Sequence, residues 1–221
     1  VAYAGLGHYD AAISSLQEAR SIFAQLGNQA WSASAELEIA AVLRFHGAPE
    51  QSLAMARSCC AQFRKLQLPV EEAQSCLIAA RAALRLGRTD ATSELAGQAL
   101  AIGQTMDIAS LTYQAHHVLG RVAAQEGLHG QAQESYGAAI EQLERLRGRL
   151  MVEFRADFLE DKTAVYEDMV LLCLALDQPH SGLEYVERAK SRALVEMLAF
   201  RLDVSIEARA PEDQAQVDAL L

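Results

Sequence analysis

The stretch LGRVAAQEGLHGQAQESYGAA, residues 119–139, carries the pattern that decides the fold, and GLGHYDAAISSLQEA, residues 5–19, carries it again. In each stretch a glycine is followed five residues later by an alanine, and seven residues further on by another alanine. The glycine recurs every 40 residues, at Gly7, Gly47, Gly87 and Gly127. A fixed period of this length indicates stacked structural repeats.

Three columns of small residues share the register of the glycines. They are Ala12, Ser52, Thr92 and Ala132, then Ala19, Cys59, Ala99 and Ala139, then Ala40, Ala80 and Gly120. Two antiparallel helices need small side chains where their backbones cross closely, and a glycine can end the first helix in the left-handed conformation. Each repeat is therefore predicted to be a helical hairpin. Stacked hairpins bury a continuous core and form a solenoid.

The same pattern predicts the positions of the helices and of the domains. Helices are expected at 10–26, 29–46, 49–66, 70–86, 90–105, 108–126, 130–146, 150–176 and 181–200. Pro49, Pro69, Pro179 and Pro211 stand at predicted helix starts, and Asp10, Thr89 and Ser181 are predicted N-caps. Residues 1–146 are expected to form repeats, the first of them truncated. Residues 147–202 are expected to form a longer pair that closes the array. Residues 203–221 are expected to form a connector and the start of a helix that leads to a domain beyond Leu221.

Composition excludes several classes of protein. The chain is 51% hydrophobic with a formal net charge of −10, which argues against disorder and against binding to nucleic-acid phosphates. The longest apolar run, 169–176, has eight residues, whereas a membrane helix needs roughly 20. The four cysteines show neither disulfide-framework nor metal-ligand spacing. We therefore expect buried free thiols and a cytoplasmic protein.

No pattern in the sequence indicates catalysis. It contains no glycine-rich phosphate loop and no nucleophile elbow. Cys76 and His116 occupy equivalent positions in neighbouring repeats, but two ligands are too few for a structural zinc site. The prediction is a fragment that is not itself an enzyme, with no catalytic residue, cofactor or metal.

The small-residue pattern resembles the tetratricopeptide repeat (TPR) over roughly residues 1–146, with Leu119, Gly120, Ala132, Tyr136 and Ala139 at signature positions. The period of 40 exceeds the family's usual 34, and the proline that usually follows the second helix is missing, so the resemblance is to long-repeat members. It implies an all-α, right-handed superhelical solenoid of antiparallel helix pairs.

A second resemblance lies in FRADFLEDKTAVYEDMVLLCLAL, residues 154–176, and GLEYVERAKSRALVEMLA, residues 182–199. These resemble the last helical pair before the caspase-like protease domain of bacterial CHAT proteins. The matching residues are Arg155, Phe158, Leu159, Tyr166, Glu187, Arg188, Ala189, Lys190, Arg192, Ala193 and Leu194. The resemblance implies that a cysteine protease domain follows Leu221. The alternative interpretation of the second segment is a solvated helix face with paired charges.

The TPR geometry directs five positions of each first helix toward a concave groove. The groove prediction names Leu37, Arg44, Phe45, Gln74, Leu77, Arg81, Arg85, Gln114, His117 and Arg121; the other inward positions are Ser34, Ala41, Leu84, Ala124 and Gln125. These fifteen positions hold four arginines and no carboxylate. Arginine binds carboxylates through two hydrogen bonds, so the groove suits an acidic or C-terminal peptide. Alternatively, the arginines pair with Glu36 or Glu38, or keep an empty groove soluble.

The leading functional hypothesis is a protein–protein interaction scaffold that binds a peptide or partner protein and regulates a downstream caspase-like protease domain. The alternative is a sensing module of a signalling ATPase or transcription activator. No nucleic-acid or membrane partner is expected. We expect both ends of the sequence to be cut, which would leave the end repeats without a polar cap and favour self-association through those ends.

Overall fold

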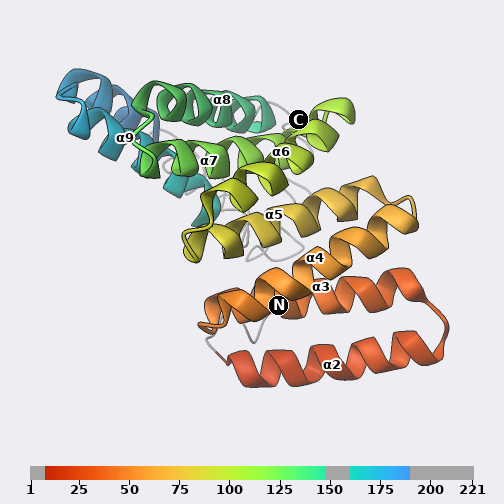
Figure 1. The fold of residues 1–221 in the computed structure, drawn as a ribbon. Coiled ribbons are helices and arrows are strands. Elements are labelled where there is room, and N and C mark those ends of the chain that lie inside the picture. Colours follow the sequence, from red (N-terminus) through yellow and green to blue (C-terminus); the bar gives the residue numbers. More distant parts are fainter. Residues whose placement is uncertain (1–7, 148–159, 190–221) are drawn as a thin grey trace, which may run out of the picture. The chain divides into compact units, whose positions relative to one another are not determined.

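The computed structural model describes residues 8–147 and 160–189, all in helices and their connecting turns (Figure 1). The chain divides after Arg149 into two compact units, which we describe separately. The first contains α2 (Tyr9–Gln25), α3 (Gln29–Phe45), α4 (Pro49–Lys65), α5 (Pro69–Arg85), α6 (Thr89–Thr105), α7 (Ala109–Gln125) and α8 (His129–Arg147). Each of these seven helices agrees with its predicted bounds to within one residue.

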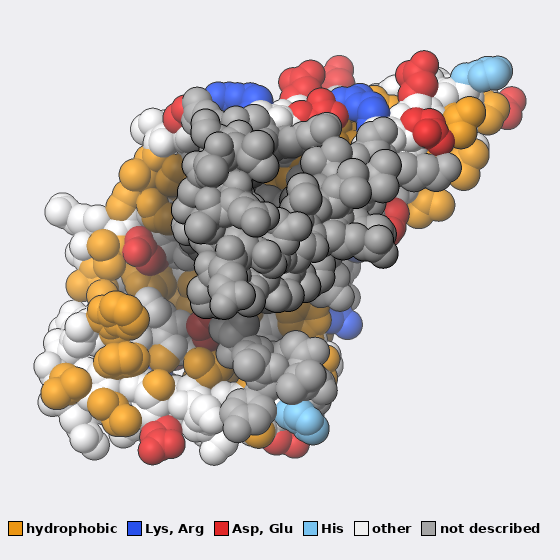
Figure 2. All heavy atoms as spheres, turned by 180° about the vertical axis from the view of Figure 1, so that it is seen from behind, with side chains coloured by type: hydrophobic (Ala, Val, Ile, Leu, Met, Phe, Trp, Pro, Cys, Tyr) orange, Lys and Arg blue, Asp and Glu red, His pale blue; other side chains and the backbone are white. Residues whose placement is uncertain are grey.

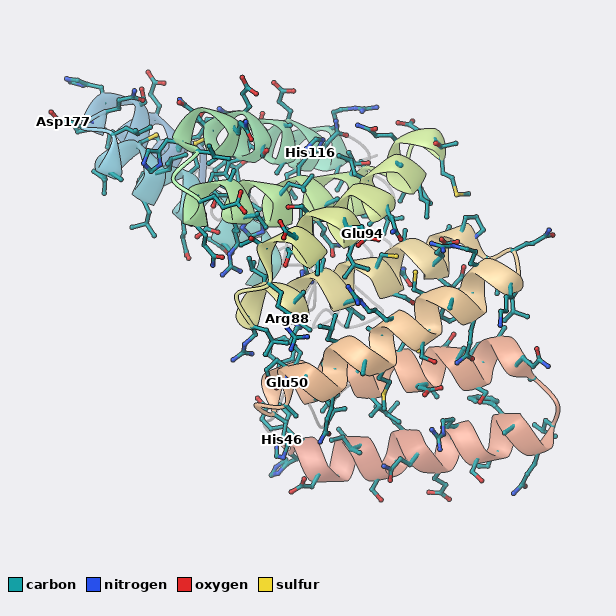
Figure 3. All side chains as sticks on the ribbon, viewed as in Figure 1. His46, Glu50, Arg88, Glu94, His116 and Asp177 are labelled. Atoms are coloured by element: carbon teal, nitrogen blue, oxygen red, sulfur yellow. The ribbon has the colours of Figure 1, made fainter. Side chains whose placement is uncertain are left out.

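The underlying step of the first unit is 20 residues, half of the period visible in the sequence. The helices α2 to α7 each have 17 residues, and a three-residue turn joins each to the next. Successive turns lie at opposite ends of the helices (Figure 1). His46 and Arg88 lie in two turns that are 40 residues apart, and Glu50 follows the first of them; all three accordingly lie along the same edge (Figure 3).

The turns share one hydrogen bond, in which the amide of the last turn residue donates to the carbonyl five residues earlier. In the α2–α3 turn, the Asn28 amide donates to the Phe23 carbonyl at 2.9 Å and the Gly27 amide donates to the Ala24 carbonyl at 3.0 Å, which is the Schellman arrangement. The middle residue of each turn has a positive φ. This residue is glycine in four of the turns, but it is Gln67 at 58° and Asp107 at 51° in the other two. Between glycines that are 40 residues apart there is therefore another turn of the same shape, at Gly27, Gln67 or Asp107.

The small-residue columns lie where helices cross, as predicted. All of their members are buried except Ala19, which lies on the end helix α2 and is half-buried. Ser52 shows how close the contact is, because its hydroxyl donates to the Ala40 carbonyl of α3 at 2.7 Å. At Gly120 the neighbouring helices approach even more closely, because a Cβ there would lie 2.5 Å from two ring atoms of Tyr136.

Within the first unit, each helix packs against its neighbours in sequence, and α5 also contacts α3 and α7. One continuous core runs from α3 to α7 and is rich in alanine, with Phe63 as its largest fully buried side chain. The first unit is thus an all-α solenoid of antiparallel helix pairs. At the α2 end of the array the apolar side chains are less well covered: Ile22 of α2, Leu26 of the α2–α3 turn and Trp31 of α3 are exposed. Figure 2 shows apolar side chains on the surface of this lower part of the repeat array.

The predicted N-caps Asp10, Thr89 and Ser181 are wrong. Asp10 and Thr89 lie inside the first turns of their helices, whose N-cap residues are His8 and Arg88, and Ser181 lies within helical residues 179–189. The Schellman turns fix the helix starts, and the side chain that does cap is Asn28, whose Oδ1 accepts from the Trp31 amide at 3.1 Å.

The second unit contains α9 (Glu160–Ala175) and the helical residues 179–189. The turn between them again has a positive φ, 55° at Asp177, and the Gln178 amide donates to the Cys173 carbonyl at 2.9 Å. Pro179 begins the second helix as predicted. The predicted connector 203–210, the helix from 211 and the CHAT-like residues Arg155, Phe158, Leu159, Lys190, Arg192, Ala193 and Leu194 lie outside the described residues.

Candidate functional site

The helices α3, α5 and α7 form the candidate binding surface, because they are the alternate helices that contact one another directly. Of the ten predicted groove residues, seven are exposed or partly exposed on these helices. We call these seven residues the arginine face: Arg44, Phe45, Gln74, Arg81, Arg85, Gln114 and Arg121.

Two contacts of the arginine face join neighbouring repeats. The Arg81 Nη2 of α5 donates to Oε1 of Gln114 on α7 at 3.1 Å. The Arg85 Nη1 of α5 donates to the Arg44 carbonyl near the end of α3. Both contacts link positions of the same predicted groove. The sequence alone did not indicate which of these positions would be in contact. The two contacts hold α5 guanidinium groups against both neighbouring first helices.

Arg44 and Phe45 place a cation and an aromatic ring side by side on this face. The guanidinium carbon of Arg44 lies 4.1 Å from the centroid of the Phe45 ring, which is within cation–π range. The Phe45 side chain is nevertheless 53% exposed. An exposed aromatic ring beside a guanidinium group can contact an apolar and an acidic side chain of one ligand.

The other three predicted groove residues are buried rather than exposed. Leu37 and Leu77 belong to the hydrophobic core, and the His117 ring lies 6.0 Å from the Tyr136 ring of α8. Their helical positions do turn them toward the neighbouring helices, but the close packing of those helices covers them. Leu37 and Leu77 therefore support the arginine face from below, and the apolar contact available at its surface is Phe45.

A cavity of about 340 Å³ lies elsewhere, between α2, α3 and the end of α4, and no pattern in the sequence indicates it. It is lined by Ala24, Gly27, Gln29, Ser32, Gln62, Lys65 and Leu66. None of these residues belongs to the arginine face. The cavity lies beside the α2–α3 turn, at the less well covered end of the array.

Residues 8–147 and 160–189 contain neither a cluster of potential metal ligands nor a helix able to span a membrane. Within these ranges no three or more His, Cys, Asp and Glu side chains lie close enough to hold a metal ion together. Across the same ranges, no helix has both the length and the apolar content that crossing a bilayer would require.

No protein-family model matches the chain, and no curated protein does so. Solved structures do match. BtubC from P. vanneervenii superposes with a TM-score of 0.68 at 14% identity, over 95% of this chain and 78% of its own. The apo form of RapI gives 0.65 at 16% identity over 83% of this chain, which matches about half (48%) of the length of RapI.

A putative kinesin light chain from Podosopora anserina, with nearly identical TPR-like repeats, gives a TM-score of 0.60 at 17% identity over 86% of this chain and 89% of its own. At this level of identity the similarity concerns the fold. Together with the paired helices and the small-residue crossings, it shows that this chain adopts the fold of TPR-like helical repeat proteins.

Proposed function

We propose that the chain is a protein–protein interaction scaffold that binds an acidic or C-terminal peptide on the arginine face. The observation that carries the proposal is the placement of arginines on three successive first helices in a chain with a net charge of −10. None of the fifteen predicted inward positions is a carboxylate. A surface of this composition attracts an anionic partner to one face of an otherwise acidic protein.

The contacts of the arginines support this proposal. A guanidinium group carries five N–H donors in a planar fork, so the single hydrogen bond from Arg85 to the Arg44 carbonyl leaves donors that can bind a carboxylate. That hydrogen bond also restricts the side chain before a ligand arrives. Ordering before binding reduces the entropy lost on association.

The second part of the proposal is that the array regulates a caspase-like protease domain that follows it in the full protein. It rests on the resemblance of the E-R-A-K segment to CHAT proteins, of which Glu187, Arg188 and Ala189 lie in the described helical residues 179–189. The coding sequence beyond Leu221 tests this part. An α/β domain with a histidine and a cysteine supports it, and a DNA-binding helix-turn-helix contradicts it.

Peptide binding is tested with a peptide library that varies acidic residues and the C-terminal carboxylate, read out by fluorescence anisotropy at low salt. For a peptide that binds, we expect the Arg81→Glu plus Arg121→Glu variant to weaken binding at least tenfold, because a hydrogen bond to a charged group contributes about 1.5–3 kcal/mol. Arg20→Glu plus Arg57→Glu is the matched control. It makes the same charge change on exposed positions of α2 and α4, and we expect it to change affinity about twofold. Binding that survives the first variant contradicts the proposal.

A further inference from the structure

Two cysteines from neighbouring helices meet in the core of the repeat array. The Sγ atoms of Cys60 on α4 and Cys76 on α5 are 2.7 Å apart. The two residues stand at equal distances in sequence from Leu68, in the α4–α5 turn, so the antiparallel packing of α4 and α5 brings them together. A disulfide has an S–S distance of about 2.05 Å. The sulfur atoms would therefore have to approach by only about 0.7 Å.

A polar cluster adjoins this pair. Arg64 lies one helical turn after Cys60, and its Nε donates to Oε1 of Glu72 at 2.8 Å while its Nη2 donates to Oε1 of Gln98 at 3.2 Å. The same Gln98 oxygen lies 3.7 Å from the Cys76 Sγ. The pair thus lies between apolar core and a charged network that joins α4, α5 and α6.

These surroundings give the two thiols different roles. A hydrogen bond links the two thiols. It lowers the pKa of Cys60, and the Arg64 charge acts in the same direction, against the opposing effects of burial and of Glu72. The same hydrogen bond, together with burial, raises the pKa of Cys76. We therefore assign the attacking thiolate, which is the nucleophilic form, to Cys60, the less buried of the two thiols and the one a helical turn from Arg64.

We propose that Cys60 and Cys76 are a redox-active pair that forms a reversible disulfide between α4 and α5. The oxidant is a small-molecule disulfide such as oxidised glutathione. The Cys60 thiolate attacks one of its sulfurs and expels a glutathione thiolate, leaving a mixed disulfide. Cys76 then gives up its proton and attacks the Cys60 sulfur, expelling the second glutathione. Two protein thiols are oxidised, one glutathione disulfide is reduced, and the two released thiolates take up the two protons.

The neighbouring Cys59 provides an internal contrast. Cys59 lies on a different face of α4, where its thiol donates to the Ala33 carbonyl of α3 at 3.7 Å. Burial raises its pKa to about 12, so it stays protonated near neutral pH. Cys60 retains 6% exposure, whereas Cys59 and Cys76 are fully buried. Cys60 is thus the member of this cysteine group that an oxidant reaches first.

The test uses the full chain and needs no binding partner, so it is independent of the proposed peptide site. The reduced protein is incubated with oxidised glutathione, quenched with acid, and alkylated with N-ethylmaleimide under denaturing conditions. Intact mass and peptide mapping then locate the modified cysteines. We expect two of the four cysteines to escape alkylation, joined as Cys60–Cys76. We also expect the melting temperature to rise by roughly 5–10 °C, reversibly with dithiothreitol, because a loop of this length is closed.

Two variants assign the roles. Cys59→Ala plus Cys173→Ala should form the same disulfide, while Cys76→Ala should stop at the mixed disulfide on Cys60. Four alkylated thiols in the oxidised wild-type protein would overturn the proposal. A bond that involves Cys59 or Cys173, or one that joins two chains, would do so as well. The wild-type measurement decides the matter even if a variant fails to fold.

Discussion

Replacing Gly120 with alanine should destabilise the repeat array, although alanine is normally the better helix residue. Gly120 lies within α7 (Ala109–Gln125), at the crossing with α8. An added Cβ would lie 2.5 Å from Cδ1 and from Cε1 of Tyr136, and 3.2 Å from its Cγ. Non-bonded carbon atoms are most favourable at about 3.5–4.0 Å. The tyrosine ring would therefore have to move by about 1 Å.

The expected magnitude follows from two opposing contributions. Tyr136 is buried and its ring packs near that of His117, so it cannot move without disturbing the α7–α8 interface. Overpacking of this kind costs typically 1–3 kcal/mol. Alanine in place of a helical glycine contributes about 0.5–1 kcal/mol in the opposite direction. We expect the free energy of unfolding to fall by about 1–2 kcal/mol.

Urea denaturation followed by circular dichroism measures this change, with Gly97→Ala as the matched control. Gly97 also lies inside a helix, α6 (Thr89–Thr105), but an added Cβ there meets nothing within 4 Å. Gly97→Ala should therefore raise the free energy of unfolding by about 0.5–1 kcal/mol. The two variants make the same chemical change and should have opposite signs.

A second background isolates the contact with the ring. In a Tyr136→Leu protein the smaller side chain leaves room for the new methyl group, so Gly120→Ala should become neutral or stabilising there. The reasoning is refuted if Gly120→Ala stabilises the wild-type protein as much as Gly97→Ala does. An equal effect of Gly120→Ala in both backgrounds would show that the ring is not the cause.

Two further stability predictions use pairs of positions that the repeat makes equivalent. At the positive-φ turn positions, Gln67→Gly should raise the free energy of unfolding by about 0.5–1 kcal/mol, because relief of left-handed strain exceeds the added freedom of the unfolded chain. Gly87→Ala, at a φ of 69°, should lower it by about 1 kcal/mol, and equal effects of the two in urea denaturation would contradict this account. In the core, Phe63→Ala should cost about 3–5 kcal/mol because Phe63 is fully buried. The equivalent Phe23→Ala should cost less than half of that, because Phe23 is half-buried on the end helix; similar costs measured by the same method would disprove the idea.

The helices could be predicted from the sequence because their ends are local features. Glycine spacing, proline positions and the small-residue columns placed seven helices to within one residue. The 20-residue step is not visible in the spacing of the glycines, because Gln67 and Asp107 adopt the left-handed conformation without being glycine. The signal was present, since both residues lie midway between glycines 40 residues apart, but residue type alone could not reveal it.

The candidate site was predicted in outline only. Helical periodicity assigned Arg81, Arg85 and Gln114 to the inner side of the first helices, and in the structure Arg81 contacts Gln114 while Arg85 contacts the Arg44 carbonyl. It did not show that Leu37, Leu77 and His117 are covered. Periodicity gives the direction of a side chain around its helix axis, whereas burial depends on how near the next helix lies.

The sequence by itself determined that this protein is a stack of helical hairpins, because turns and close crossings need particular small residues at fixed intervals. Only the tertiary structure decided which side chains meet across the helices. Cys60 and Cys76 appear in the sequence as two unremarkable buried thiols, and the structure places their sulfurs 2.7 Å apart. Gly120 appears as one more small residue, and the structure sets it against the Tyr136 ring. The physical reason is that such contacts depend on the distance and angle between two helices, which all the packed side chains set together.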